Sequence, residues 1–495
     1  MRRLVVAWVV CVGQAVAAQE DGGEALSPVE DAGVVRVAPP MASVVDAGVS
    51  PSPVTSFDVA ATPWGPGRKS SGEAFKSAAT AVDEGPLRWK WNDFSAAVGL
   101  QYFARAEARD NADLSAAARD FAMAIEHRAR VTGRVSAFGR VGAVLELQDV
   151  RGWGTEASTV SLLPATALHQ GFVDLKATSW LDVRIGRQEL SYGEDRLIGN
   201  LDWAMTARAF DGVFVRASPA EGLTIDAFGM LVKPPGFLTD AGGGRFQNSG
   251  TYFSGAYARW RKGKAGVDAY VLGLLDDPST SVTGFRPDHN RLTLGARGLL
   301  PLGPVALVGE GALQLGTTSA KERILAGAFA GRATWTLPVA GLYVMGDVSA
   351  ATGDGTPGDG TDSTFNQLFP TGHVHLGFID YVAWQNVVGV RGTVGLKQPF
   401  VHVWLDFHHL RAWDSRGTWY AANGSVFIPA SAARTDGVMG NELDLSVTVP
   451  LHGSVALSGA FSVFLPGAMA DPGSTGVGRG TSPSTWAFVY LRTQL

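Results

Sequence analysis

Arginine and carboxylate side chains alternate with apolar residues in several stretches of this chain, most clearly between residues 129 and 149. There the even positions include Arg130, Arg134, Arg140 and Glu146, whereas the odd positions are mostly Ala, Val and Leu. A period of two places the two sets on opposite faces of a β-strand. A guanidinium is a planar, permanently charged fork that matches a carboxylate, so arginines on such a face can form paired hydrogen bonds with carboxylates.

The same alternation continues along later segments and assigns one polar face to nearly every one of them. Basic and acidic members are about equal in number, so we expect most of them to pair with one another across an aqueous passage. Selectivity would depend on the few that reach the narrowest point. The candidates that this pattern supplies are Arg128, Arg130, Arg140, Glu146, Arg391, Asp406 and Glu442.

The elements that carry these side chains are about eighteen short segments of roughly ten residues, a length that suits a tilted membrane strand. Short connections with Gly, Pro or Lys, such as 218–222 and 262–264, alternate with long ones such as 192–207 and 352–382. The predicted segments are 95–106, 119–131, 137–149, 168–178, 181–191, 208–217, 222–232, 250–261, 265–276, 290–300, 304–316, 323–337, 342–351, 383–396, 400–411, 439–449, 454–465 and 484–494.

This organisation predicts an all-β fold, an antiparallel transmembrane β-barrel of about 18 strands over residues 92–495. A soluble β-sandwich or propeller is the alternative, but it does not need polar residues on one face of nearly every strand. A barrel of this size leaves an aqueous channel, so the expected function is a pore. Aromatic residues near strand ends are expected in the girdles at the membrane interfaces, among them Trp384, Trp486, Phe488 and Tyr490.

The N-terminal region has a different composition. Residues 1–18 combine two arginines, an apolar run and small residues at 15–18, which predicts a secretory signal peptide whose removal also removes the single cysteine, Cys11. Residues 19–88 are rich in Pro and Ala and carry ten acidic and five basic side chains. We expect a disordered periplasmic tail there, because so little apolar surface cannot offset the loss of chain entropy.

The remaining charge is nearly balanced and gives no reason to expect nucleic acid as a partner. An outer-membrane enzyme or an adhesion protein is the alternative of a different class. His402, Asp406 and His408 share one face of a predicted strand, a composition that acid–base or metal chemistry can use. No Gly-x-Ser-x-Gly nucleophile motif accompanies them in the sequence. We therefore predict no enzymatic activity, no cofactor and no metal site.

The densest polar block is 181–216, where Asp-Val-Arg-Ile-Gly-Arg-Gln-Glu-Leu-Ser-Tyr-Gly-Glu-Asp-Arg-Leu-Ile-Gly-Asn-Leu-Asp-Trp precedes Ala-Arg-Ala-Phe-Asp-Gly-Val. This block resembles the alginate-export family of outer-membrane β-barrels. Three weaker similarities lie at 148–151, 365–370 and 440–445. The resemblance extends over roughly 92–495, whereas the acidic tail is not part of the family pattern.

The resemblance implies an 18-stranded barrel in the outer membrane of a Gram-negative bacterium. It also implies passive passage of an anionic polysaccharide, or of small anionic solutes, through an arginine-rich constriction capped by loops. Expected partners are outer-membrane lipid, that solute and periplasmic export proteins. Two alternatives stay open. The protein could be a general or substrate-specific diffusion porin, and the Arg–Asp pairs of the 181–216 block could only attach a loop to the wall. By the motif, the constriction candidates are Arg184, Arg187, Arg196, Arg208, Asp195, Asp202 and Asp211.

Overall fold

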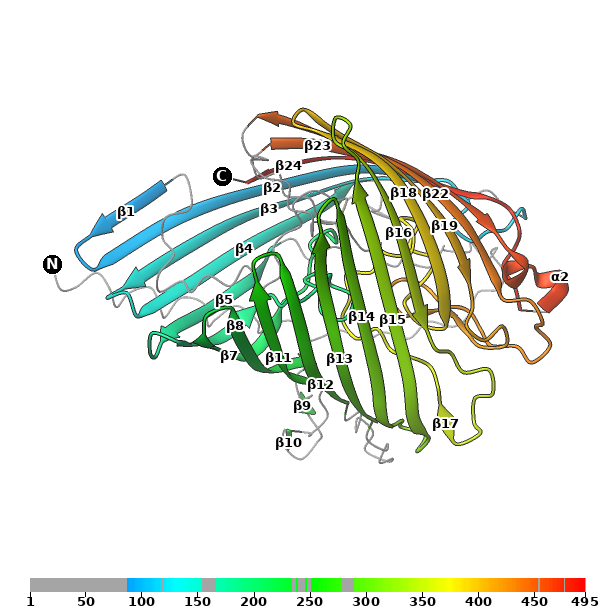
Figure 1. Ribbon diagram of the computed structural model, residues 1–495, viewed down its shortest axis with the longest axis horizontal. Coiled ribbons are helices and arrows are strands. Elements are labelled where there is room, and N and C mark those ends of the chain that lie inside the picture. Colours follow the sequence, from blue (N-terminus) through cyan, green and yellow to red (C-terminus); the bar gives the residue numbers. More distant parts are fainter. Residues whose placement is uncertain are drawn as a thin grey trace, which may run out of the picture. The chain divides into compact units, whose positions relative to one another are not determined.

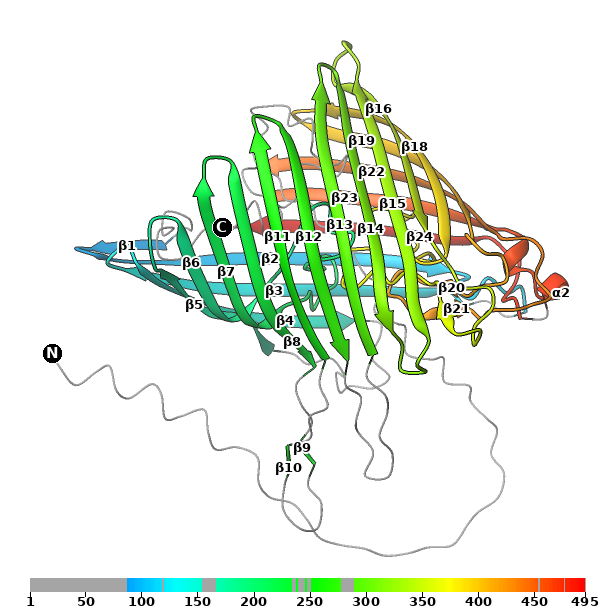
Figure 2. The same cartoon turned by 60° about the horizontal axis from the view of Figure 1, so that its bottom comes forward.

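A computed structural model describes residues 87–117, 120–153, 166–233, 237–238, 245–246, 251–276, 289–452, 455–475 and 477–494. In this part of the chain, eighteen antiparallel strands form one closed sheet (Figure 1, Figure 2). The predicted signal peptide and residues 19–86 of the predicted tail lie outside the described residues. Among the described residues, no helix is long and apolar enough to cross a membrane.

Each barrel strand pairs with its neighbours in chain order, and β2 closes the sheet by pairing with both β3 and β24. The barrel strands are β2 (Phe94–Asp110), β3 (Ala122–Ala137), β4 (Val141–Trp153), β5 (Thr166–Lys176), β6 (Leu181–Gln188), β7 (Phe210–Ala220), β8 (Leu223–Lys233), β11 (Thr251–Lys262), β12 (Ala265–Asp276), β13 (His289–Leu302), β14 (Val305–Thr317), β15 (Arg323–Thr336), β16 (Leu342–Ala351), β18 (Val387–Gln398), β19 (Val401–Arg411), β22 (Val438–His452), β23 (Val455–Pro466) and β24 (Ser484–Gln494).

The predicted barrel is confirmed, and each of the eighteen predicted segments overlaps one of these strands. The largest error in a boundary concerns β3, which was expected to end at residue 131. Its Gly133 instead pairs with Leu145 inside the sheet, and the chain turns only at Phe138 and Gly139, both with positive φ. Such a pair of residues suits a tight hairpin that follows the twist of the strands.

An extra strand, β1 (Leu87–Trp91), pairs with the first residues of β2, Phe94 to Val98. It lies along the edge of β2 that β24 leaves uncovered, because β24 pairs with β2 only from Gln101 onward. The sequence interpretation assigned residues 87 and 88 to the tail, whereas here they belong to this strand.

The alternation of side chains along the strands separates an apolar outer wall from a polar inner one. In β4, Leu145 and Leu147 are about half exposed on the outside, whereas Glu146 and Gln148 are buried on the inside. The same pattern recurs in β22, where Leu443 and Leu445 are exposed. A continuous apolar exterior of this kind is the surface that a barrel presents to lipid.

Three long connections pack inside the barrel. Loop A (189–209) joins β6 to β7. Loop B (352–386, containing β17, Thr361–Asp362) joins β16 to β18. Loop C (412–437, with β20, Trp419–Tyr420, and β21, Val426–Ile428) joins β19 to β22. All three connections leave the same end of the barrel, which we call the loop end; the tight turns lie at the turn end.

The three loops share an apolar core that includes Trp203, Phe365 and Trp419, each no more than 1% exposed. A short parallel bridge joins Ile198 of loop A to Phe369 of loop B. Other short elements at the loop end are the β9 (Phe237–Leu238) and β10 (Arg245–Phe246) pair, the 3-10 helix η1 (Ala468–Ala470) and the helix α2 (Pro472–Thr475).

Candidate functional site

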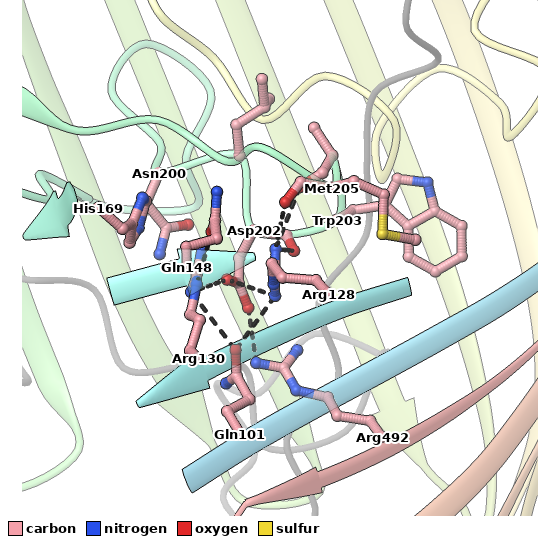
Figure 3. A network of polar contacts seen from close by, with 12 residues as sticks. Gln101, Arg128, Arg130, Gln148, His169, Asn200, Asp202, Trp203, Met205 and Arg492 are labelled. Atoms are coloured by element: carbon pink, nitrogen blue, oxygen red, sulfur yellow. Dashed lines mark hydrogen bonds and ion pairs between the residues drawn. The ribbon is translucent and has the colours of Figure 1, made fainter. Parts of the chain in front are cut away.

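The carboxylate of Asp202, in loop A, is held by three arginines of the barrel wall (Figure 3). Its Oδ1 accepts Arg128 Nη2 at 3.0 Å and Arg130 Nη1 at 2.9 Å, and its Oδ2 accepts Arg492 Nη2 at 2.6 Å. These side chains come from β3 and β24, which flank β2, and all four residues are at most 4% exposed. We call this group the Asp202 cluster.

Further acceptors fix the direction of these guanidinium groups. Arg128 also donates to the carbonyl oxygens of Asp202 and Ala204, at 2.9 and 3.1 Å, and Arg130 Nε donates to Gln148 at 2.8 Å. Charges that are removed from water in this way are tolerated only when paired and hydrogen-bonded. The cluster therefore attaches loop A firmly to one side of the wall.

A second group of ion pairs attaches loop A to strands far from the first around the barrel. Arg196 of loop A donates to Asp347 of β16 at 3.1 Å and to Ser349 at 3.0 Å. Arg332 of β15 bonds Asp347 at 3.1 Å and Glu194 of loop A at 2.7 Å. Arg391 of β18 lies 3.5 Å from the same Asp347. With attachments on both sides, loop A crosses the lumen.

Arg208 and Asp195 connect loop A to loop B. Arg208 Nη1 donates to the carbonyl oxygens of Gly199, Phe369 and Pro370 at 2.9, 2.5 and 3.0 Å. The carbonyl oxygen of Asp195 accepts the Thr371 N–H at 2.8 Å. The two backbones approach so closely that a Cβ on Gly199 would lie 2.8 Å from the Thr371 nitrogen, so glycine is required there.

Two predicted lumen residues, Arg187 and Asp211, lie on the outer face instead. They pair with each other at 2.7 Å across β6 and β7, with side-chain exposures of 36% and 54%. The expectation that they line the constriction is therefore wrong. Side chains alternate between the two faces of a strand, so Arg187 lies on the face opposite to Arg184. Arg184 points inward and binds Asp174 with two hydrogen bonds.

Arg140 does not reach the lumen either. It follows Phe138 and Gly139 in the exposed turn at the turn end of the barrel. The alternation that was counted through residue 140 is interrupted there, because the turn reverses the chain before β4 begins at Val141.

The remaining candidates lie on the inner wall next to the loops. Glu146 accepts Thr132 Oγ1 at 2.6 Å, and Glu442 accepts the backbone N–H of Ile379, in loop B, at 2.8 Å. Asp406 accepts a hydrogen bond from Thr393. Glu442 therefore holds loop B, whereas Glu146 and Asp406 bond to neighbouring wall strands.

Loop B contributes a buried His373–Asp380 pair, with Nδ1 and Oδ2 3.0 Å apart. Burial lowers the pKa of His373 well below its usual range and raises the pKa of Asp380 well above it. Both shifts favour the neutral form of each group, so a protonated carboxyl donating to a neutral ring is the state that fits this site.

Several charged side chains of the inner wall are fully covered at this level. Arg128, Asp226 and Asp268 have no exposed surface. Sequence reasoning did not identify Glu194 and Arg492, and it placed Trp384, Trp486, Phe488 and Tyr490 in the outer girdle. Trp384 is instead buried and donates from Nε1 to the carbonyl oxygen of Ala350 at 3.1 Å. Trp486, Phe488 and Tyr490 are buried with Trp203, at ring-centroid distances of 4.7 to 6.4 Å.

Solved structures of outer-membrane porins have the same fold. OpdL of Pseudomonas aeruginosa is 13% identical, with a TM-score of 0.53 over 82% of this chain and 99% of that one. A BenF-like porin from Pseudomonas fluorescens Pf-5 is 11% identical, with a TM-score of 0.52 over 81% and 99%. No curated protein matches the sequence. The model of the family described as alginate export matches residues 94–477. The chain therefore belongs to the alginate-export family of outer-membrane β-barrel channels.

Proposed function

We propose that this protein is a passive channel for anionic polysaccharide or small anionic solutes, and that loop A is its internal gate. The observation that carries the proposal is the Asp202 cluster, in which three wall arginines converge on one carboxylate borne by a loop. In this interpretation Asp202 occupies the position that the carboxylate of a uronate sugar takes when the loop withdraws.

The chemistry of the cluster supports this exchange. Arg128, Arg130 and Arg492 belong to the wall and would stay behind when loop A moves, so they would then face the lumen without the negative charge of Asp202. Arginine binds carboxylates in a planar, directional manner and does not lose its charge. The nearby Glu146, which lies 3.8 Å from Arg130, keeps such binding weak enough for release.

We place the loop end outside the cell, and the tight turns, β1 and the N-terminal tail in the periplasm. Long outer loops and short periplasmic turns are the arrangement that outer-membrane barrels adopt. The apolar outer wall would contact outer-membrane lipid, and periplasmic export proteins are the partners that the tail could contact.

A porin without a role in polysaccharide export is the second candidate. It is favoured by the near balance of charge inside the barrel, where wall arginines such as Arg184 and Arg216 each bind a wall carboxylate at 2.8 Å or less. In that case the ion pairs stabilise the lumen without selecting for anions.

Ion selectivity separates the two candidates. The purified protein is inserted into a planar bilayer, the reversal potential is measured in a salt gradient, and a polyuronate is then added. Preference for anions, with block of the current by the polyuronate, supports the anion channel. A weakly selective pore that the polymer does not affect supports the general porin and contradicts our proposal.

A further inference from the structure

We propose that Glu146, His169 and Glu189 bind a divalent transition-metal ion, Zn²⁺ by preference, which joins the root of loop A to the barrel wall. Glu146 lies on β4, His169 on β5, and Glu189 is the first residue of loop A after β6. The three residues are separated by about twenty positions each and do not form a metal-binding sequence motif. The sequence analysis therefore did not identify them and predicted no metal site.

The ligand atoms converge on a small volume. Nε2 of His169 lies 2.8 Å from Oε1 of Glu189 and 3.9 Å from Oε1 of Glu146, and the three potential ligand atoms lie within 4.8 Å of one another. Ligands of a tetrahedral zinc ion, at bond lengths of about 2.0–2.1 Å, are separated by about 3.3 Å. Small side-chain rotations therefore suffice to place an ion between them.

In this conformation hydrogen bonds hold the three groups: Nε2 of His169 and Oε1 of Glu189 share one at 2.8 Å, and Gln170 donates to Oε1 of Glu146 at 3.3 Å. Nε2 of a neutral imidazole can donate to only one of the two carboxylates, and Oε1 of Glu146 lies 3.9 Å from it. An ion at the centre would accept a lone pair from each of the three groups. The side chains of His169, Glu146 and Glu189 are 3%, 9% and 12% exposed, so the site is largely shielded from competing water.

Neighbouring polar groups hold the two carboxylates in place. Thr132 donates to Oε2 of Glu146 at 2.6 Å, and Asn200 of loop A donates to Oε2 of Glu189 at 2.8 Å. Figure 3 shows His169 and Asn200 next to the Asp202 cluster. Such outer hydrogen bonds orient metal ligands, and an ion would displace the contacts that Gln170 and His169 make with the two Oε1 atoms.

The ligand set determines the metal. Ca²⁺ and Mg²⁺ prefer sites built from oxygen atoms alone, whereas an imidazole nitrogen favours Zn²⁺, Ni²⁺ or Cu²⁺. Arg130 opposes any cation here, since it lies 3.8 and 3.7 Å from the two carboxylates. Its short contacts are instead with Gln148 and Asp202, at 2.8 and 2.9 Å, so it leaves the ligand oxygens accessible. We expect weaker binding than at a structural zinc site.

The test uses the full chain carrying a tag without histidines, purified in detergent and stripped with EDTA. Co²⁺ serves as a spectroscopic probe in visible absorption, and Zn²⁺ binding is measured by calorimetry. We expect one ion per chain, and at least tenfold weaker binding in His169→Gln. His402→Gln is the matched control: this buried wall histidine shares a hydrogen bond with Tyr343 and packs against Trp404, so affinity should not change.

Folding of each variant is checked by heat-modifiable migration in gel electrophoresis. If His169→Gln does not fold, Glu189→Gln replaces it, because Glu189 lies just beyond the end of β6. Lack of Co²⁺ and Zn²⁺ binding by the wild-type protein would overturn the proposal, and so would a folded His169→Gln or Glu189→Gln variant with wild-type affinity. Neither measurement depends on whether the channel conducts anions.

Discussion

Oδ2 of Asp202, in a loop inside the barrel, lies 2.6 Å from Nη2 of Arg492, which is 290 residues away on the last strand. Arg492 is adjacent to the seam where β24 meets β2, so the contact links a central loop to the closure of the barrel. The same carboxylate therefore connects loop A both to the wall and to the strand that closes the barrel.

Replacing Asp202 by Asn keeps its shape and removes its charge. We expect Asp202→Asn to be destabilising by about 3–5 kcal/mol, because it leaves buried arginines without their counter-charge. Loop A should also leave the lumen more often, which single-channel recordings would detect as a higher open probability. The urea midpoint of the barrel in micelles measures the loss of stability.

The matched control for this change is Asp211→Asn, which removes the carboxylate of the exposed Arg187 pair on the outer face. Arg187 and Asp211 lie at the loop-end termini of β6 and β7, at the edge of the apolar wall. Exposed ion pairs contribute about 0–1 kcal/mol, so both the urea midpoint and the gating should stay near the wild-type values. Equal effects of the two substitutions would contradict the role that we assign to the Asp202 cluster.

Selectivity should follow the balance of charge in the same cluster. Asp202→Asn leaves Arg128, Arg130 and Arg492 with excess positive charge, so the reversal potential should shift toward anions. Adding Arg130→Gln removes one of these charges and should reverse part of the shift. Because the residues are in contact, their effects on stability should not be additive, which a double-mutant cycle measures. The Arg187→Gln, Asp211→Asn pair should leave the reversal potential unchanged.

The sequence predicted the barrel and the approximate position of each of its strands, because period-two alternation and turn residues are local signals. It also placed Arg128, Arg130 and Glu146 on the inner face. It could not predict that Trp486, Phe488 and Tyr490 face inward, since parity divides a strand into two faces without stating which face meets lipid when both are apolar. The buried partner Trp203 comes from a loop whose insertion is a long-range event.

The errors at Arg187 and Asp211 have a related cause. The family motif includes them in the same block as Asp202, but the motif mixes a strand end, an inserted loop and the start of the next strand. Alternation from Arg184 alone would have placed Arg187 outside. Glu194 was missed because its partners, Arg332 and Arg297, lie on strands more than a hundred residues away.

The His373–Asp380 pair should make the docking of loop B sensitive to pH. The pKa of Asp380 is raised in the folded protein above its ordinary value of 3.8, so its stabilising contribution is complete below about pH 3.8 and is lost as the pH rises through the folded value. Asp380→Asn keeps a donor toward His373 and cannot ionise. The variant should therefore gain stability relative to the wild type as the pH rises from acid toward neutral.

His373 acts in the opposite pH direction. Burial lowers its pKa below 6.5, so the folded state loses stability as the pH falls below about 6.5, and Asp380→Asn should retain this loss. Urea midpoints of both proteins across this range, with hydrogen exchange in loop B, test the assignment. Parallel pH curves for the two proteins would show that Asp380 has an ordinary pKa.

Trp203 provides a test of how far packing, rather than charge, holds loop A in the lumen. Its ring is 1% exposed, stacks with His373 at 5.4 Å and lies under the Arg105 guanidinium at 4.5 Å. Trp203→Ala should cost about 3–5 kcal/mol, as expected for truncating a buried tryptophan. It should also raise the open probability without a shift of reversal potential, because the charges of the Asp202 cluster are kept.

Trp413→Ala, in the exposed part of loop C, is the control and should change neither the stability nor the open probability. A loss of anion preference in Trp203→Ala would mean that the ring orients the arginines as well as retaining the loop.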